Sequence, residues 1–262
     1  APTTTGATIL LESGTVTTSG AGAHAVYANN ATGDITISEG AAGVITTTGA
    51  TADGIEILNN GSGNTAVTTA GTITATGTGI NTINNSTAGN TTISQTAGTI
   101  TGGTNGINSL NDGTGSTNIT VAGVVTGGTG VGINTSDSDT ISSTTDNFAT
   151  VTLNSGAVVS STSGVAIQND EGDSLTTVNS GAAIQGKVIS GDGNDNLVIN
   201  GTANISGATL LDGGDKANSV DLLGSTAYTN KLIFNGTTQS IAGSTMVDWQ
   251  TVTLDNSNVT FV

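Results

Sequence analysis

The chain has 262 residues, of which 19 are acidic and only 3 are basic, and its formal net charge is −16. The basic residues are Lys187, Lys216 and Lys231, so residues 1–186 offer no cation to a phosphate backbone or an anionic membrane, which excludes nucleic acid as a main partner. No apolar run approaches the roughly 18 residues of a transmembrane helix, and without Cys the fold has no disulfides.

The composition favours strands along the whole chain. Thr, Val and Ile are abundant beside 40 Gly, and these β-branched residues lose χ1 freedom in helices but pack well on a pleated surface. The first residues, Ala1-Pro2-Thr3, contain neither the charged nor the apolar region of a signal peptide. We interpret them as the mature terminus left after signal cleavage, and we expect a secreted protein.

A phrase of Gly, any residue, a β-branched residue and Thr recurs at intervals of roughly 25–30 residues, a period typical of solenoids. Its clearest copies begin at Gly14, Gly43, Gly71, Gly98 and Gly123, and looser copies begin at Gly156, Gly181 and Gly201. In a solenoid each unit buries its apolar face against its neighbours. We therefore expect the β-branched residues of this phrase to form one inward ladder of Val16, Ile45, Ile73, Ile100 and Val125.

Two further elements complete each unit. A Gly followed by an aliphatic residue predicts a second ladder of Ile55, Ile80, Ile107, Ile133 and Val165. Asn-containing pairs then indicate a turn, because Asn tolerates the left-handed conformation and its amides can stack between coils; they occupy residues 29–30, 59–60, 84–85, 111–112 and 169–170. A short strand follows each turn, as in Ile35-Thr36-Ile37 and Ile119-Thr120-Val121.

Three strands and three turns per unit predict an all-β fold, a right-handed parallel β-helix (β-solenoid) of about ten coils with a triangular cross-section. At about 4.8 Å per coil, the rod would be on the order of 50 Å long. A β-sandwich also has turns every 8–12 residues or so, but it does not require the same phrase in every unit. The repeat therefore favours the solenoid.

The two parts of the chain differ in character but belong to one predicted solenoid. Residues 1–186 are expected to form coils of roughly 25–30 residues, and residues 187–262 the last coils and a C-terminal cap. Large side chains close an open core better than Thr or Val. Aromatic residues are concentrated in this last part: Tyr228, Phe234, Trp249 and Phe261.

Residues 190–198, Ser-Gly-Asp-Gly-Asn-Asp-Asn-Leu-Val, match the calcium-binding nonapeptide at nearly every position, with Ser in place of the first Gly. Calcium takes about six to eight oxygen ligands, so one copy cannot close a site without a neighbouring copy. The next coil departs from the pattern, because Lys216 and Asn218 stand where Gly and Asp belong. The candidate calcium ligands are Asp192, Asp195, Asp212 and Asp215; the alternative is an acidic, solvated turn.

Three runs in the C-terminal third carry a family resemblance: Gly-Asp-Gly-Asn-Asp at 191–195, Leu-Asp-Gly-Gly at 211–214, and Asp-Trp-Gln-Thr-Val-Thr-Leu at 248–254. Together with the repeat style over most of the chain, they resemble the passenger domains of bacterial autotransporters (type V secretion), of the pertactin-like and adhesin-like kind. The resemblance implies a right-handed β-helix at, or released from, the outer surface of a Gram-negative bacterium. The membrane barrel of that family, with its alternating strands of roughly ten residues, does not appear in this sequence, which implies that it was cleaved or omitted.

Nothing in the sequence indicates catalysis. His24 is the only His, and no Gly-x-Ser-x-Gly run accompanies it, so we interpret it as a surface or turn residue rather than part of a Ser-His-Asp triad. Residues 1–186 lack the basic residue that β-helical polysaccharide lyases generally use, and scattered acids give no carboxylate pair for glycoside hydrolysis. We expect a non-enzymatic protein.

Thr residues recur in two registers. Thr17, Thr46, Thr74, Thr101 and Thr126 share one, and Thr15, Thr72 and Thr99 share another two residues earlier. Flat Thr arrays occur on ice-binding solenoids, but Thr also suits any solvent-facing strand position, and Val44 and Val124 interrupt the second register.

These features predict a non-catalytic passenger, secreted or displayed at the cell surface, that acts in adhesion or in interaction with proteins or glycans of host and other cell surfaces. One alternative is a self-assembling subunit of an extracellular filament or surface layer, joined through exposed strand edges such as residues 7–11. The other alternative is an ice-binding protein.

Overall fold

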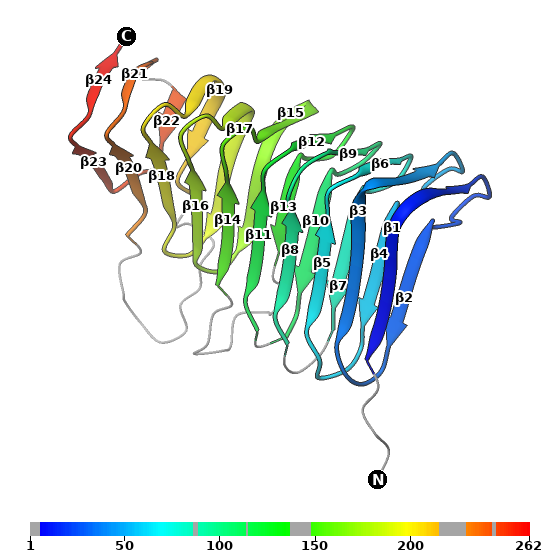
Figure 1. The fold of residues 1–262 in the computed structure, drawn as a ribbon. Coiled ribbons are helices and arrows are strands. Elements are labelled where there is room, and N and C mark those ends of the chain that lie inside the picture. Colours follow the sequence, from blue (N-terminus) through cyan, green and yellow to red (C-terminus); the bar gives the residue numbers. More distant parts are fainter. Residues whose placement is uncertain (1–5, 86–88, 114, 137–147, 215–228, 243–244) are drawn as a thin grey trace.

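The computed structural model describes residues 6–85, 89–113, 115–136, 148–214, 229–242 and 245–262. These residues form strands, turns and loops, and no α-helix occurs among them. Successive strands wind into a stack of coils, in which each strand pairs in parallel with its counterpart one coil further along the chain (Figure 1). The fold is therefore the parallel β-helix that the repeat predicts.

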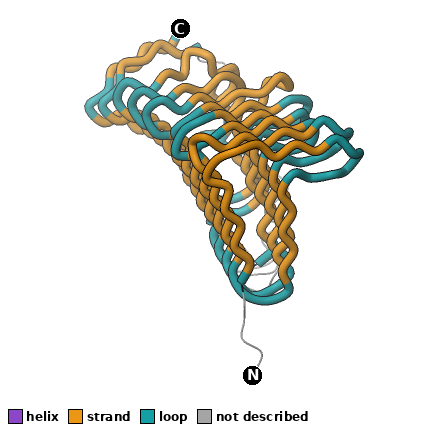
Figure 2. Tube along the Cα trace, turned by 45° about the vertical axis from the view of Figure 1, so that its right-hand side comes forward, coloured by secondary structure: helices purple, strands orange, loops and turns teal. Residues whose placement is uncertain are grey.

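The coils up to β19 contribute strands to three faces, and the turns between the faces lie in rows along the stack (Figure 2). Face 1 has ten strand levels in the described residues, in agreement with the predicted number of coils. It consists of the first parts of β1 (Ala7–Thr18) and β3 (Ile35–Thr47), followed by β5 (Thr65–Thr69), β8 (Thr91–Gln95), β11 (Thr117–Val121), β14 (Ala149–Leu153), β16 (Ser174–Val178), β18 (Asn196–Asn200), β20 (Lys231–Asn235) and β23 (Thr251–Asp255).

Faces 2 and 3 share several long strands that bend from one face to the next. Face 2 consists of the second parts of β1 and β3, then β6 (Thr72–Ala75), β9 (Thr99–Gly102), β12 (Val124–Gly127), and the first parts of β15 (Val158–Glu171), β17 (Ala183–Asp192) and β19 (Asn204–Asp212). Face 3 consists of β2 (Val26–Asn30), β4 (Ile55–Asn59), β7 (Ile80–Asn84), β10 (Ile107–Asn111), β13 (Ile133–Ser136), the second parts of β15, β17 and β19, and β22 (Met246–Val247). The strands β21 (Thr238–Ile241) and β24 (Asn258–Phe261) form a separate parallel pair.

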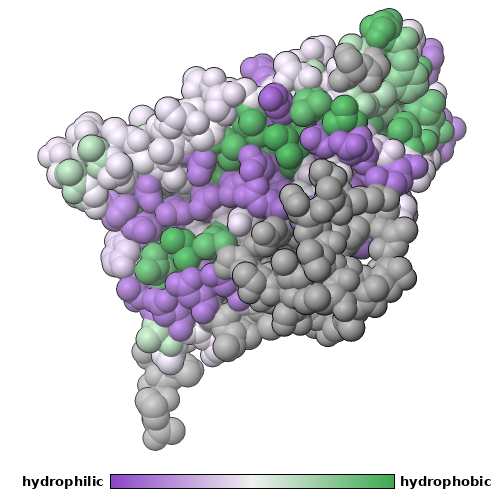
Figure 3. Space-filling model, turned by 180° about the vertical axis from the view of Figure 1, so that it is seen from behind, coloured by the Kyte–Doolittle hydropathy of each residue, from purple (hydrophilic) through white to green (hydrophobic). Residues whose placement is uncertain are grey.

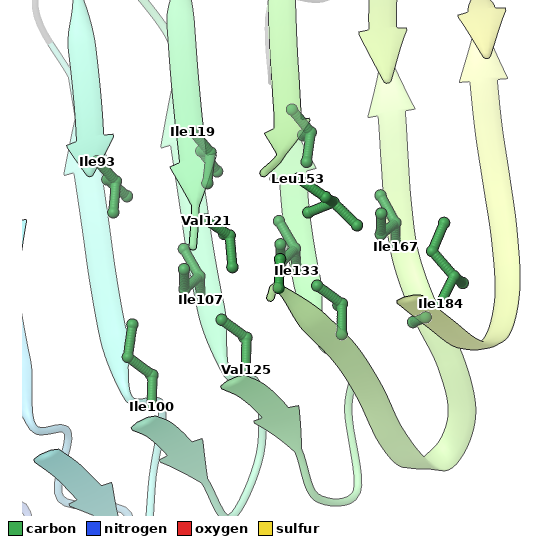
Figure 4. Packing of buried hydrophobic residues seen from close by; sticks show 14 of the residues in the cluster. Ile93, Ile100, Ile107, Ile119, Val121, Val125, Ile133, Leu153, Ile167 and Ile184 are labelled. Atoms are coloured by element: carbon green, nitrogen blue, oxygen red, sulfur yellow. The ribbon is translucent and has the colours of Figure 1, made fainter. Parts of the chain in front are cut away.

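The aliphatic ladder predicted for face 2 is confirmed. Val16 pairs in register with Ile45, and the same column continues through Ile73, Ile100 and Val125. All but the terminal Val16 are buried. Figure 4 shows Ile100 and Val125 from neighbouring coils beside the face 1 residues Ile93 and Ile119 in one continuous core.

The ladder predicted for face 3 is correct for four of its five members. Ile55, Ile80, Ile107 and Ile133 stack in register, but the next member is Ile167 and not Val165. The strand β15 contains register shifts on both sides of Val165, which pairs instead with Lys187. The Gly-aliphatic phrase therefore fails here, because buried Ala166 and Ile167 take the positions that Gly132 and Ile133 hold one coil earlier.

Gly71 shows why the repeated phrase on face 2 begins with glycine in this part of the stack. A Cβ atom at this position would overlap the buried carboxylate of Glu39, whose Oε2 accepts hydrogen bonds from the hydroxyl of Thr69 and from the backbone N–H of Gly71 at 3.2 Å. A larger residue would thus have to displace an inward acid. At Gly14 the reason is different: its φ of 101° lies in the left-handed region that favours glycine.

The C-terminal coils continue face 1 through β20 and β23 and face 3 through β22. Phe234 is fully buried in the hydrophobic core. Trp249 packs against the same core, and its Nε1 donates to the carbonyl oxygen of Leu211 at 2.9 Å. Phe261 is 49% exposed. Tyr228 lies outside the described residues, so two of the four aromatic residues expected to form the cap are seen to pack against the core.

Candidate functional site

The outer side of face 2 presents two columns of short side chains. In β6 and β9 the burial alternates, so that Ile73 and Ile100 point into the core while Thr72 and Thr74 point outward. The first column contains Thr15, Val44, Thr72, Thr99, Val124 and Val158, and the second contains Thr17, Thr46, Thr74, Thr101, Thr126 and Ser160. The two predicted Thr registers therefore lie side by side on one wall.

Four hydroxyl groups in the middle of these columns are available for contacts outside the molecule, whereas those of Thr126 and Ser160 lie 3.4 Å apart and bond to each other. Those of Thr72, Thr74, Thr99 and Thr101 make no hydrogen bond to any part of the chain that the structure describes. Thr residues at the turn behave differently: Oγ1 of Thr47 donates to the carbonyl oxygen of Ala52 at 2.7 Å. The wall thus combines fixed β-branched side chains with unused donors and acceptors.

The Asn residues at the end of face 3 stabilise the turns of the solenoid. Asn30, Asn59, Asn84 and Asn111 stack in register at the end of face 3, and their side-chain amides donate to backbone carbonyls of the following turn, as in the 2.7 Å bond from Asn59 to Gly63. The predicted pairs therefore mark stacked turns, but none of their Asn residues takes the left-handed conformation in the described chain. Asn169 departs from the ladder, because it pairs in register with Thr135.

His24 lies in the loop between β1 and β2 and is not an isolated turn residue. Its Nε2 lies 2.7 Å from Oε2 of Glu56, and its Nδ1 accepts a 3.1 Å hydrogen bond from the backbone N–H of Asp53. Both acids belong to the next coil. Burial raises the pKa of Glu56, while attraction to His24 opposes that rise and repulsion from Asp53 adds to it.

Three of the four candidate calcium ligands lie within the described residues. Asp195 is buried, with Oδ1 accepting a 2.6 Å hydrogen bond from the hydroxyl of Ser174. Asp192 ends β17, and Asp212 accepts a hydrogen bond from the backbone N–H of Gly214 at 3.0 Å. Asp215 lies outside the described residues, so the four-ligand site stays a prediction. Within the described part of the chain, the side chains close enough to share a metal ion are instead His24, Asp53 and Glu56.

Bands of like hydropathy run along the molecule when it is seen from behind (Figure 3). They arise because equivalent positions in stacked coils carry similar residues. One such outward column on face 3 is formed by Asn81, Asn108 and Asn134, whose amides are linked by 2.9 Å hydrogen bonds. These three Asn residues thus form a continuous polar stripe over successive coils of face 3.

The described residues contain no helix with the length and apolar character needed to cross a membrane. Comparison of the chain with family models, curated proteins and solved structures gave no match.

Proposed function

We propose that this protein is a non-catalytic adhesive passenger of the autotransporter type, and that face 2 is the surface that contacts other cells. The observation that carries the proposal is the pair of outward columns that runs along successive coils, with the hydroxyls of Thr72, Thr74, Thr99 and Thr101 unused within the described chain. Repetition along one wall lets many weak contacts form together.

The chemistry of the wall favours a neutral, polar ligand. Its side chains are short and stiff at χ1, so little conformational entropy is lost when they bind. Hydroxyls can both donate and accept, which suits the hydroxyl groups of glycans and the backbone of a protein strand. The net charge of −16 and the absence of any cation before Lys187 disfavour anionic ligands.

Binding of the labelled protein to cells and to an array of neutral glycans tests the proposal. Thr74→Tyr places a large side chain in the middle of face 2 and is expected to reduce binding at least about tenfold. The matched control is Thr68→Tyr, which changes an equally exposed Thr on face 1. Equal loss in both variants, or no binding by the unmodified protein, would reject face 2 as the contact surface.

Ice binding is a second candidate function because both Thr registers lie outward on the same wall. Val44 and Val124 interrupt one column, but each Val retains a methyl group at the Thr position. A thermal hysteresis assay separates the two functions. Shaping of ice crystals that Thr74→Tyr abolishes would favour ice over glycans or proteins.

End-to-end assembly is the other alternative, and the last coil carries the observation in its favour. Val252 and Leu254 occupy the positions in register with the buried Leu232 and Phe234, yet they are 43% and 47% exposed. Exposed apolar strands are prone to pair with another chain. Sedimentation velocity over a concentration series should show a single species for an adhesive monomer and growing polymers for a filament subunit.

A further inference from the structure

The contact between His24, Asp53 and Glu56 joins the first two coils at their edge. One ligand atom from each residue can be chosen so that all three lie within 4.8 Å of one another. His24 and Glu56 are partly buried and Asp53 is buried, so the ligand atoms are held in place but accessible from outside. His24 lies in the loop before β2, Asp53 in the equivalent bend before β4, and Glu56 is the second residue of β4.

Asp53 is fixed by residues of the third coil. Its Oδ1 accepts a 2.6 Å hydrogen bond from the backbone N–H of Thr78, and its Oδ2 accepts a 3.1 Å bond from the amide of Asn81. That amide ends a chain in which Asn134 donates to Asn108 and Asn108 donates to Asn81. Each amide therefore directs its N–H donor toward the carboxylate of Asp53. Residues that surround a metal site orient its ligands through hydrogen bonds of this kind.

The two carboxylates of the cluster face a single imidazole. Nδ1 of His24 accepts the backbone N–H of Asp53, and Nε2 faces Glu56. Residues 1–186 contain no Lys or Arg that could neutralise the two acids. A divalent cation would supply the missing positive charge.

We propose that His24, Asp53 and Glu56 form a binding site for a divalent transition-metal ion of the zinc class, which clamps the first coil to the second. One imidazole nitrogen and two carboxylate oxygens are ligands that zinc, nickel and copper accept, whereas calcium and magnesium prefer oxygen ligands alone. The ion takes one ring nitrogen and one oxygen from each acid, and water fills the remaining positions. The bound ion competes with the hydrogen bonds that hold the His24 ring in this structure.

Isothermal titration of the metal-free protein with Zn²⁺, and then with Ca²⁺, tests the site, and thermal unfolding with and without Zn²⁺ reports the clamp. We expect one equivalent of Zn²⁺ to bind and to raise the unfolding temperature, because an ion that binds only the folded state stabilises it. Substitution of Co²⁺ for Zn²⁺ should give visible absorption bands that depend on His24.

The variants His24→Ala and Glu56→Gln should weaken Zn²⁺ binding at least about tenfold and remove the thermal shift. Glu12→Gln, an exposed acid on β1, is the matched control and should bind as the unmodified protein does. His24→Gln provides a second, polar replacement if His24→Ala perturbs folding by circular dichroism. Absence of Zn²⁺ binding, equal binding in all variants, or equal stabilisation by Ca²⁺ would overturn the proposal.

Discussion

Oδ1 of Asp195 accepts a 2.6 Å hydrogen bond from the hydroxyl of Ser174, while Oδ2 has no hydrogen-bond partner among the described residues. Burial raises the pKa of this carboxyl group to about 7, against the effect of the Ser174 bond and with smaller help from the charges of Asp173 and Asp192. The folded protein therefore keeps a proton on Asp195 at pH values where the unfolded chain has released it.

Asp195→Asn should make stability less dependent on pH. The raised pKa favours the folded state fully below the unfolded value of 3.8, and this contribution is lost as pH rises toward about 7. From pH 4 to pH 8 the unmodified protein should lose up to about 4 kcal/mol of unfolding free energy relative to Asp195→Asn, since one pKa unit corresponds to about 1.4 kcal/mol. Urea unfolding at both pH values measures the difference. The stability of the exposed control variant Asp255→Asn should depend on pH as that of the unmodified protein does. If the stability of Asp195→Asn has this same pH dependence, the raised pKa does not belong to Asp195.

The inner Asn ladder should contribute more to stability than the outer amides beside it. Asn59 is buried and bonds both to the carbonyl oxygen of Gly63 and to the backbone N–H of Gly61. Asn59→Ala leaves those groups without partners and should cost about 1–3 kcal/mol of unfolding free energy. Its neighbour Asn60 is exposed, and Asn60→Ala should cost less than about 1 kcal/mol. Chemical denaturation of both variants measures their unfolding free energies. Similar losses in the two variants would show that the inner Asn ladder contributes no more to stability than the outer amides.

Two Phe residues of the C-terminal coils provide a matched test of core packing. Phe234 is fully buried and Phe261 is 49% exposed. Phe234→Ala should lower the unfolding free energy by about 3–5 kcal/mol, whereas Phe261→Ala should lower it by less than about 1 kcal/mol. Thermal or urea unfolding gives both values. If Phe261→Ala proves as costly as Phe234→Ala, the terminal residues pack in a way that the described burial does not show.

The inward ladders could be predicted because each repeat places a β-branched residue at a fixed distance from a turn glycine. Val16, Ile45 and Ile73 follow this rule, and the parallel register then sets their stacking. The rule fails at Val165, where β15 has register shifts and the inward residue comes two positions later. A local insertion of this kind changes which positions of the strand face the core. The amino-acid composition of the strand gives no sign of that change.

The cluster around His24 could not be predicted from the neighbouring sequence, because its two acids lie one coil further along the chain. His24 and Asp53 are separated by 29 residues, the same interval as Gly14 and Gly43. Alignment of successive repeats would have placed His24 next to Asp53, and Glu56 next to Tyr27. The signal was present in the repeat, but the spacing is too long for a local motif.

The buried acids could not be predicted from residue type. Glu39 lies two residues after the inward Ile37 and is buried, with Oε1 lacking a hydrogen-bond partner among the described residues. A charged residue at the end of a strand is normally expected to face water. Only the register shows that Glu39 continues the inward column above Thr69.

The most direct test of the proposed function removes the hydroxyls of face 2 while keeping its shape. Four Thr→Val replacements, at Thr72, Thr74, Thr99 and Thr101, retain β-branched side chains and should leave the fold intact by circular dichroism. The matched control makes the same change on face 1, at Thr68, Thr92, Thr120 and Thr152. We predict that binding to cells falls at least about tenfold for the face 2 variant and is unchanged for the face 1 variant. Full binding by the face 2 variant, or an equal loss in both, would contradict the account.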